Sequence, residues 1–263
     1  MSMFCPTELA ARLERAEAGL IAAAVSGARP IGGGYAAYAS PGSPLNKVAG
    51  LGFADPPTEA GLDDVERWFA AAGSPVQAEV ATLADPAVAE LLTARGYRLA
   101  GCENVLGCVP SGQPAAAEVE VREVSTAGAF QEWLDVVADA VMVDDVQGVP
   151  SHESFARDIV VTAMLDMARA GLRHYLALRD GVPAGGASLR IADGVAQLTG
   201  AATLPDHRRR GVQQALLAAR LRDAAAEGAG LATITTQPGS KSHQNAQRQG
   251  FDLLYTRLIL VKD

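Results

Sequence analysis

The 263-residue sequence is poor in aromatic residues, in cysteine and in positive charge. Its three cysteines form no closely spaced pair with histidines beside it, so we expect free thiols and neither a metal site nor a disulfide. The formal net charge of −8 argues against the broad basic face of a nucleic-acid binder and against a polybasic membrane anchor. No run approaches the roughly 18 apolar residues of a membrane span, and the first residues lack the uncharged stretch of a signal peptide. We therefore expect a cytoplasmic protein with no nucleic-acid or membrane partner.

Apolar residues make up 49% of the sequence, enough for a sizeable core built mostly from Ala, Val and Leu. The length allows one large domain or two modest ones. Between residues 109 and 117, Pro, Gly and Ser interrupt every periodic pattern, as is typical of a linker. We expect a first domain at 1–110, a linker at 111–117 and a second domain at 118–263.

Helix and strand patterns alternate through both predicted domains. The clearest helix signal opens at Asp85 with a capping side chain and a proline, and it stops at Gly96. Each half closes with a helix, a glycine, an aromatic residue and a strand, around Gly96 and again around Gly250, which indicates two related domains. In the first half we expect an N-terminal amphipathic helix, helices at 63–72 and 85–95, and strands at 76–80 and 97–106. In the second half we expect strands at 119–124, 173–179, 184–192, 195–203, 231–236 and 251–261, and helices at 128–142, 152–170, from 211 onward and at 241–249.

Three arginines stand at a predicted helix start in the stretch TLPDHRRRGVQQALL, residues 203–217. The first amides of a helix lack internal partners and carry a partial positive charge, which makes a ready anion site. Arginines there oppose the helix dipole by about 0.3–1 kcal/mol each, unless an anion lies between them. Gly211 can adopt a positive φ and lets a ligand approach the backbone. The stretch therefore indicates a phosphate-bearing ligand, although a solvated basic turn is the alternative.

The motif Arg208-x-x-Gly211-Val212-Gln213, placed between a strand and a Leu-rich helix, resembles the acyl-CoA signature of the GNAT N-acetyltransferase superfamily. The order of elements in 118–263 and the closing NAQRQGF unit resemble that family as well. The first half looks like a degenerate copy without the arginine turn. The resemblance implies an α/β fold of two GNAT-like domains, each with a mixed, mostly antiparallel central sheet flanked by helices.

The resemblance also implies where acetyl-CoA, or another acyl-CoA, would bind. In the family, the turn holds the CoA diphosphate, the pantetheine arm lies along the preceding strand like an added strand, and an asparagine of the closing helix contacts that arm. Small residues from Gly200 onward favour a bulge with room for the thioester. The corresponding residues here are Ala201, Ala202, Thr203, Arg208, Arg209, Arg210, Gly211, Val212, Gln213, Gln214 and Asn245.

The catalytic groups are less clear, because two family features are missing. Many members carry a glutamate base on the strand at 195–203, where this chain has no carboxylate and Gln197 cannot act as a base. The usual thiolate donor is a tyrosine at the position of Ala246. Candidate substitutes are Tyr255, which is alternatively a core tyrosine, and His243 and Ser242, which are alternatively surface polar residues.

The acceptor is expected to be the primary amine of a small molecule or peptide, attacked directly without a metal. The candidate acceptor-binding residues are Asp144, Asp145, His152 and Glu153, in a segment that lines the acceptor site in relatives. A CoA-binding or protein-binding module that has lost the chemistry is the main alternative, and an aminoglycoside-type resistance enzyme is a third. Neither the acceptor nor the oligomeric state can be predicted from the sequence.

Overall fold

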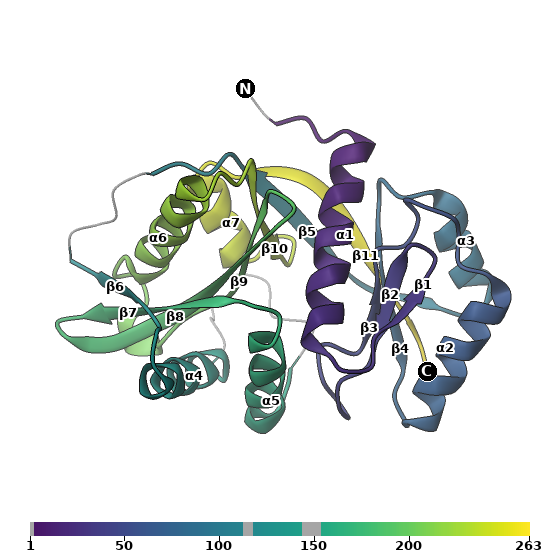
Figure 1. The fold of residues 1–263 in the computed structure, drawn as a ribbon, viewed down its shortest axis with the longest axis horizontal. Coiled ribbons are helices and arrows are strands. Elements are labelled where there is room, and N and C mark those ends of the chain that lie inside the picture. The colour runs from purple at the N-terminus through teal and green to yellow at the C-terminus, as the bar shows by residue number, and fades with distance from the viewer. Residues whose placement is uncertain (1–2, 113–117, 144–153) are drawn as a thin grey trace.

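An 11-stranded mixed sheet runs through both halves of the chain, with helices on its two faces (Figure 1). The computed structural model describes residues 3–112, 118–143 and 154–263. The strand order is β1-β2-β3-β4-β11-β5-β10-β9-β8-β7-β6.

The first half contains α1 (Thr7–Ala24), β1 (Arg29–Ile31), β2 (Gly34–Ala37), β3 (Lys47–Ala49), α2 (Glu59–Ala71), β4 (Val76–Ala81), α3 (Pro86–Ala94) and β5 (Arg98–Cys108). The second half contains β6 (Glu120–Glu123), α4 (Ala127–Val141), α5 (Arg157–Ala168), β7 (Arg173–Arg179), β8 (Val182–Ala192), β9 (Val195–Thr203), the 3₁₀ turn η1 (Pro205–His207), α6 (Val212–Ala226), β10 (Leu231–Thr236), α7 (Lys241–Arg248) and β11 (Asp252–Lys262).

The predicted α/β fold is confirmed, and most predicted elements lie where the local signals place them. In α3, Asp85 Oδ1 accepts a hydrogen bond from the Ala87 amide at 2.9 Å, and Gly96 ends the helix with a φ of 93°. The start of the helix expected at 152–170 falls partly outside the described residues, and α5 is seen from Arg157. The strands β1 to β3 had no sequence prediction, because runs of three or four residues are too short to show a period.

The closing strands of the two halves are exchanged within the sheet. The first half ends in β5, which pairs antiparallel with β10 of the second half, and β11 lies between β4 and β5 of the first half. The cores follow this exchange, since Leu254 and Tyr255 pack with first-half residues and Leu106 packs with second-half residues. The halves therefore share one sheet across the predicted linker, and the domain boundary itself stays a prediction.

The helices of the second half lie on opposite faces of β8. A Cβ on Gly186 would meet the Trp133 side chain of α4 at 2.7 Å, and a Cβ on the neighbouring Gly185 would meet Val212 of α6 at 2.9 Å. Because neighbouring strand residues point to opposite faces, α4 and α6 are on different sides of the sheet. Both α4 and α1 contact α5, and α1 also contacts β9. Helix α1 of the first half thus lies on the α4 side, in front of the middle of the sheet (Figure 1). Within the described part of the chain, no helix is both long and apolar enough to cross a membrane.

Candidate functional site

The parallel strands β9 and β10 separate part-way along their length. They pair only over Val195–Gln197 and Leu231–Thr233. Beyond that point β9 continues to pair with β8, and β10 continues to pair with β5. We call the separated segments, 198–203 and 234–236, the strand split. The backbone edge of β9 that faces the split has no strand partner in the described structure, so an extended ligand could pair with it.

A β-bulge lies on β9 inside the strand split. Gly186 pairs with Ala202 and Ser188 with Thr199, so Gly200 and Ala201 together stand opposite one residue of β8. Gly200 has a φ of 58°, which glycine adopts without strain. The bulge that the small residues favour is confirmed, and it leaves Ala201 exposed.

The buried guanidinium of Arg220 holds the backbone next to this bulge. Its Nη1 donates to the carbonyl oxygens of Ser188 at 3.1 Å and Thr199 at 3.3 Å, and its Nε donates to Leu216 O at 3.1 Å. Burial lowers the pKa of Arg220 to about 10. These hydrogen bonds all go to backbone carbonyl groups, so the side chain positions the strand.

The arginine turn follows β9 and leads directly into α6. Gly211 is the N-cap with a φ of 80°, and no side chain caps the helix. The first helical hydrogen bond runs from the Ala215 amide to Gly211 O at 2.9 Å. The amides of residues 212–214 therefore lack intrahelical partners. Arg209 and Arg210 are exposed beside them. Two cations and three amides make this helix start suitable for a phosphate group.

Arg208, the first arginine of the turn, is hydrogen-bonded to backbone carbonyl groups, unlike the exposed Arg209 and Arg210. Its guanidinium donates to Thr203 O at 3.3 Å, to Ala140 O at 3.3 Å and to Val143 O. These carbonyls belong to the end of β9 and the end of α4. The side chain thus fastens the turn to α4, and the anion-binding role of Arg208 stays a prediction.

Helix α7 contacts the start of α6. Asn245 Nδ2 donates to Gln213 Oε1 at 2.5 Å, so two of the predicted cofactor residues meet. Ala246 is buried in the core, and no tyrosine stands at that position. Ser242 is exposed. The turn, α6 and α7 thus converge at the end of the sheet where β9 and β10 separate.

Residues 142–251 match the model of the Acetyltransferase (GNAT) family. This range contains the strand split, the arginine turn, α6 and α7. The similarity to this family therefore lies in the second half of the chain. A comparison with the curated proteins found no match.

Solved structures extend the likeness to both halves. A GCN5-related N-acetyltransferase from Kribbella flavida is 23% identical with a TM-score of 0.71, and the alignment covers 97% of this chain and 95% of that chain. A tandem GNAT protein from the clavulanic acid biosynthesis pathway is 14% identical with a TM-score of 0.59, covering 84% of this chain and 75% of that chain. A GCN5-related N-acetyltransferase from Sphaerobacter thermophilus is 15% identical with a TM-score of 0.54, covering 78% and 65%. The chain has the GNAT fold in a tandem-like arrangement.

The first half of this GNAT fold lacks the features of the arginine turn. Its strands β3 and β4 pair at one position, Val48 with Ala78. The loop after β3 is bonded to the loop after β4, because the Asp85 amide donates to Gly52 O at 2.8 Å. The N-terminus of α2 is capped by Thr58 and carries an acidic residue in its first turn. In the first half, β3, α2 and β4 follow one another as β9, α6 and β10 do in the second half. The bonded loops and the capped, acidic start of α2 therefore stand where the second half has the strand split and the uncapped start of α6.

His243 of α7 is held by a side chain from the first half. Asn104 Nδ2 lies 3.2 Å from His243 Nδ1, and Thr256 Oγ1 donates to Asn104 Oδ1 at 2.8 Å. Since Oδ1 accepts, the amide donates to Nδ1, and the neutral imidazole carries its proton on Nε2. The amide of His243 also donates to the capping Ser240 Oγ at 3.1 Å. His243 is therefore a fixed hydrogen-bond donor.

Tyr255 lies in the buried core. It is 4% exposed, and its hydroxyl donates to Glu14 Oε1 at 2.6 Å. Arg257 Nε donates to the same oxygen at 2.7 Å. Burial and the neighbouring Glu14 raise the pKa of Tyr255 well above its ordinary value. This placement favours the core interpretation of Tyr255 over the proton-donor interpretation.

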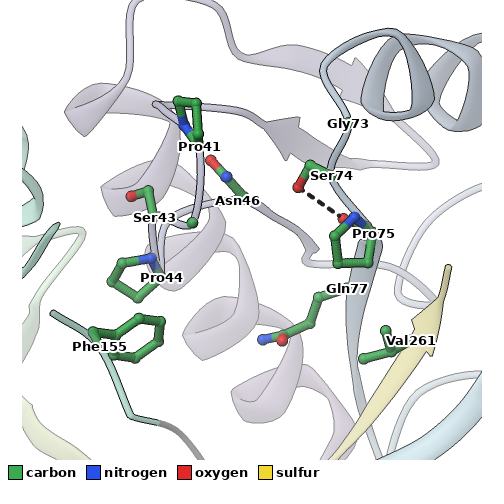
Figure 2. A pocket seen from close by; sticks show the side chains of 11 residues that line it. Pro41, Ser43, Pro44, Asn46, Gly73, Ser74, Pro75, Gln77, Phe155 and Val261 are labelled. Atoms are coloured by element: carbon green, nitrogen blue, oxygen red, sulfur yellow. Dashed lines mark hydrogen bonds between the residues drawn. The ribbon is translucent and has the colours of Figure 1, made fainter.

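The predicted acceptor residues Asp144, Asp145, His152 and Glu153 lie outside the described residues. Phe155, which follows them, lines a pocket of about 330 Å³ on the first half (Figure 2). The other lining residues come from the loop at 41–46, from residues 73–77 and from Val261 of β11. None of the described residues that line this pocket is charged, so this lining does not suit a diphosphate. In the described ranges, no three His, Cys, Asp or Glu side chains lie close enough to hold a metal ion.

Sequence reasoning missed the first-half residues that contact the second half here. Asn104 reaches His243, and Glu17 of α1 reaches Gln197 of β9. Both contacts join residues more than a hundred positions apart, so no local pattern could have indicated them.

Proposed function

We propose that the chain is an N-acyltransferase that moves an acetyl group, or another acyl group, from acyl-CoA to a primary amine. The uncapped start of α6 carries this proposal, because it combines free amides with Arg209 and Arg210 at the end of a separated strand. We further propose that residues 118–263 form the catalytic part, with 1–110 as a partner without a donor site of its own.

The residues at this helix start fit a diphosphate. Amides of Val212, Gln213 and Gln214 would donate to its oxygens, and the two exposed arginines would balance its charge. Charge-assisted hydrogen bonds of this kind contribute about 1.5–3 kcal/mol each. Arg208 would act indirectly, by holding the turn against α4.

The rest of the donor would lie along β9. The unpaired edge at Ala201–Thr203 offers backbone groups to the amides of the pantetheine arm. A backbone amide at the bulge would polarise the thioester carbonyl. Asn245, held by Gln213, would contact the arm from α7.

The chemistry requires a proton acceptor and a proton donor. A primary amine is mostly protonated at neutral pH, so a base must take one proton before the nitrogen attacks the thioester carbon. As the C–N bond forms and the C–S bond breaks, the leaving thiolate takes up a proton. We assign to His243 the role of hydrogen-bond donor to the leaving sulfur, because Asn104 fixes its Nε2–H, whereas the Tyr255 hydroxyl is bonded to Glu14. The proton that the thiolate takes up is the one that the attacking nitrogen loses.

The rival function is a CoA-binding or protein-binding module without catalysis. It is motivated by Gln197 on β9 and by the buried Ala246. Calorimetry with acetyl-CoA tests the donor site shared by both hypotheses. Release of thiol from acetyl-CoA, followed with spermidine, lysine-containing peptides and kanamycin as acceptors, separates the two. Turnover favours the transferase, and binding without turnover of any of these amines favours the rival.

A further inference from the structure

We propose that Glu17, on α1 of the first half, is the catalytic base for the transfer carried out in the second half. This inference rests on the proposed transferase function. It assigns to the first half a direct part in the reaction, although that half lacks a donor site.

Glu17 lies at the point where β9 and β10 separate. Gln197 Nε2 donates to Glu17 Oε2 at 3.2 Å. Gln197 is the last residue of β9 that pairs with β10, opposite Thr233. The carboxylate therefore stands over the closed end of the strand split, on the α1 face of the sheet, while the arginine turn lies at the far end of β9.

The contact between Glu17 and Gln197 has a defined direction. Arg190 Nη1 donates to Gln197 Oε1 at 2.8 Å, so the amide must turn its NH₂ group toward Glu17. Arg190 is itself fixed, because its Nε donates to Ala170 O at 3.1 Å. The second oxygen of Glu17, Oε1, receives no hydrogen bond from the described residues. Glu17 thus has one oxygen that is anchored and one that is available for a substrate proton.

The carboxylates near Glu17, those of Glu14, Glu79 and Glu103, each face a basic side chain. Glu14 is fully buried and accepts from Tyr255 and Arg257. Glu79 is also buried and is paired with Lys47. Glu103 faces Arg257 at 4.0 Å. Among the described carboxylates, Glu17 is the one that forms a hydrogen bond with β9. The charged or titratable groups that act on Glu17 electrostatically are Glu14, Glu103, Tyr255 and Arg257.

The proton balance of the step is complete with these groups. The substrate ammonium gives one proton to Glu17, directly or through one water, and its lone pair attacks the thioester carbon. Collapse of the adduct breaks the C–S bond, and the nitrogen loses a second proton. One proton reaches the thiolate and the other leaves Glu17 for solvent. The products are an amide, CoA thiol and one solvent proton.

The test compares the unmodified chain with Glu17→Gln, using acetyl-CoA and whichever of spermidine, a lysine-containing peptide or kanamycin is turned over fastest. We expect kcat to fall by about 100-fold or more at pH 7, with the acetyl-CoA affinity unchanged. The deficit should shrink as the pH rises, because more of the amine is then already deprotonated. Glu8→Gln is the matched control, since Glu8 is an exposed glutamate on the same helix, and it should leave kcat unchanged.

The double variant Glu17→Gln/Gln197→Glu exchanges the two side chains, so that the carboxylate of the pair lies on β9 and the amide lies on α1. It should recover part of the lost rate. An equal loss at all pH values, with no recovery in the double variant, would show a structural role only and overturn the proposal. Unchanged kcat in Glu17→Gln would also overturn it. No turnover by the unmodified chain despite acetyl-CoA binding would instead refute the transferase function itself, and the base assignment with it.

Discussion

The substitution Gly211→Asp tests the donor site at a single backbone position. Gly211 is the N-cap of α6 and has a φ of 80°. An aspartate would favour the extended backbone of an ordinary N-cap over this left-handed one, and its carboxylate would then accept from the second or third helical amide. It would place a negative charge where the diphosphate is expected.

The size of the effect follows from these contacts. Capping would take up to two amides, those of Gln213 and Gln214, from the ligand. At about 1.5 kcal/mol each, the lower value for hydrogen bonds to a charged group, the loss is about 3 kcal/mol. This corresponds to an acetyl-CoA affinity about 150-fold weaker. Stability should change by no more than about 2 kcal/mol, because an aspartate that keeps the left-handed backbone costs about 1–2 kcal/mol and one that adopts the extended backbone gains about 0.5–2 kcal/mol from the new cap.

Isothermal titration calorimetry with acetyl-CoA, alongside thermal unfolding, measures both quantities. Gly228→Asp is the matched control, because Gly228 has a φ of 74° just beyond the other end of α6. It should leave the acetyl-CoA affinity unchanged. Equal affinity for the unmodified chain and Gly211→Asp would refute the assignment of the α6 start as the diphosphate site.

Three further predictions concern buried and partly buried polar groups. Tyr255→Phe removes a hydrogen bond to the buried Glu14 and should lower the unfolding free energy by about 1–3 kcal/mol in urea while leaving kcat unchanged; a tenfold loss of kcat in a folded variant would contradict the core interpretation. Burial, with help from Glu79, raises the pKa of Glu103 from 4.5 to about 7, so the protonated form is favoured in the folded state. The unfolding free energy should therefore fall as the pH rises from about 4.5 to 7, on the order of 1–3 kcal/mol; Glu103→Gln should flatten this dependence, and an unchanged slope would refute the prediction. Arg220→Met removes the guanidinium hydrogen bonds to the carbonyl groups of Ser188, Thr199 and Leu216 and should cost about 2–4 kcal/mol in chemical unfolding; a loss below 0.5 kcal/mol would show that the guanidinium does not support the bulge.

Local signals in the sequence predicted the parts of the fold that depend on neighbouring residues. The helix α3 was predictable from its aspartate cap, its proline and Gly96. The turn before α6 was predictable in the same way, because a glycine, three arginines and a helical apolar pattern are adjacent in the chain. The family resemblance placed Gln213 and Asn245 at the donor site, and the structure shows the two side chains hydrogen-bonded to each other.

The contacts between the halves could not be predicted in this way. Both closing units carry the same local signal, so nothing in the sequence shows that β5 pairs with β10 and that β11 pairs with β4. The hydrogen bond from Arg208 to α4 could not be predicted either, because the sequence does not reveal which carbonyl groups lie within reach of its side chain. The missing base was sought on β9 alone, whereas the carboxylate next to that strand comes from α1, 180 residues earlier in the chain.

A crystal structure of the chain grown with acetyl-CoA tests the central claim most directly. We predict that the diphosphate lies on the amides of Val212–Gln214 and that the acetyl group lies between β9 and β10, on the side that Glu17 faces. Acetyl-CoA bound to the first half, or density for it away from the start of α6, would contradict the account.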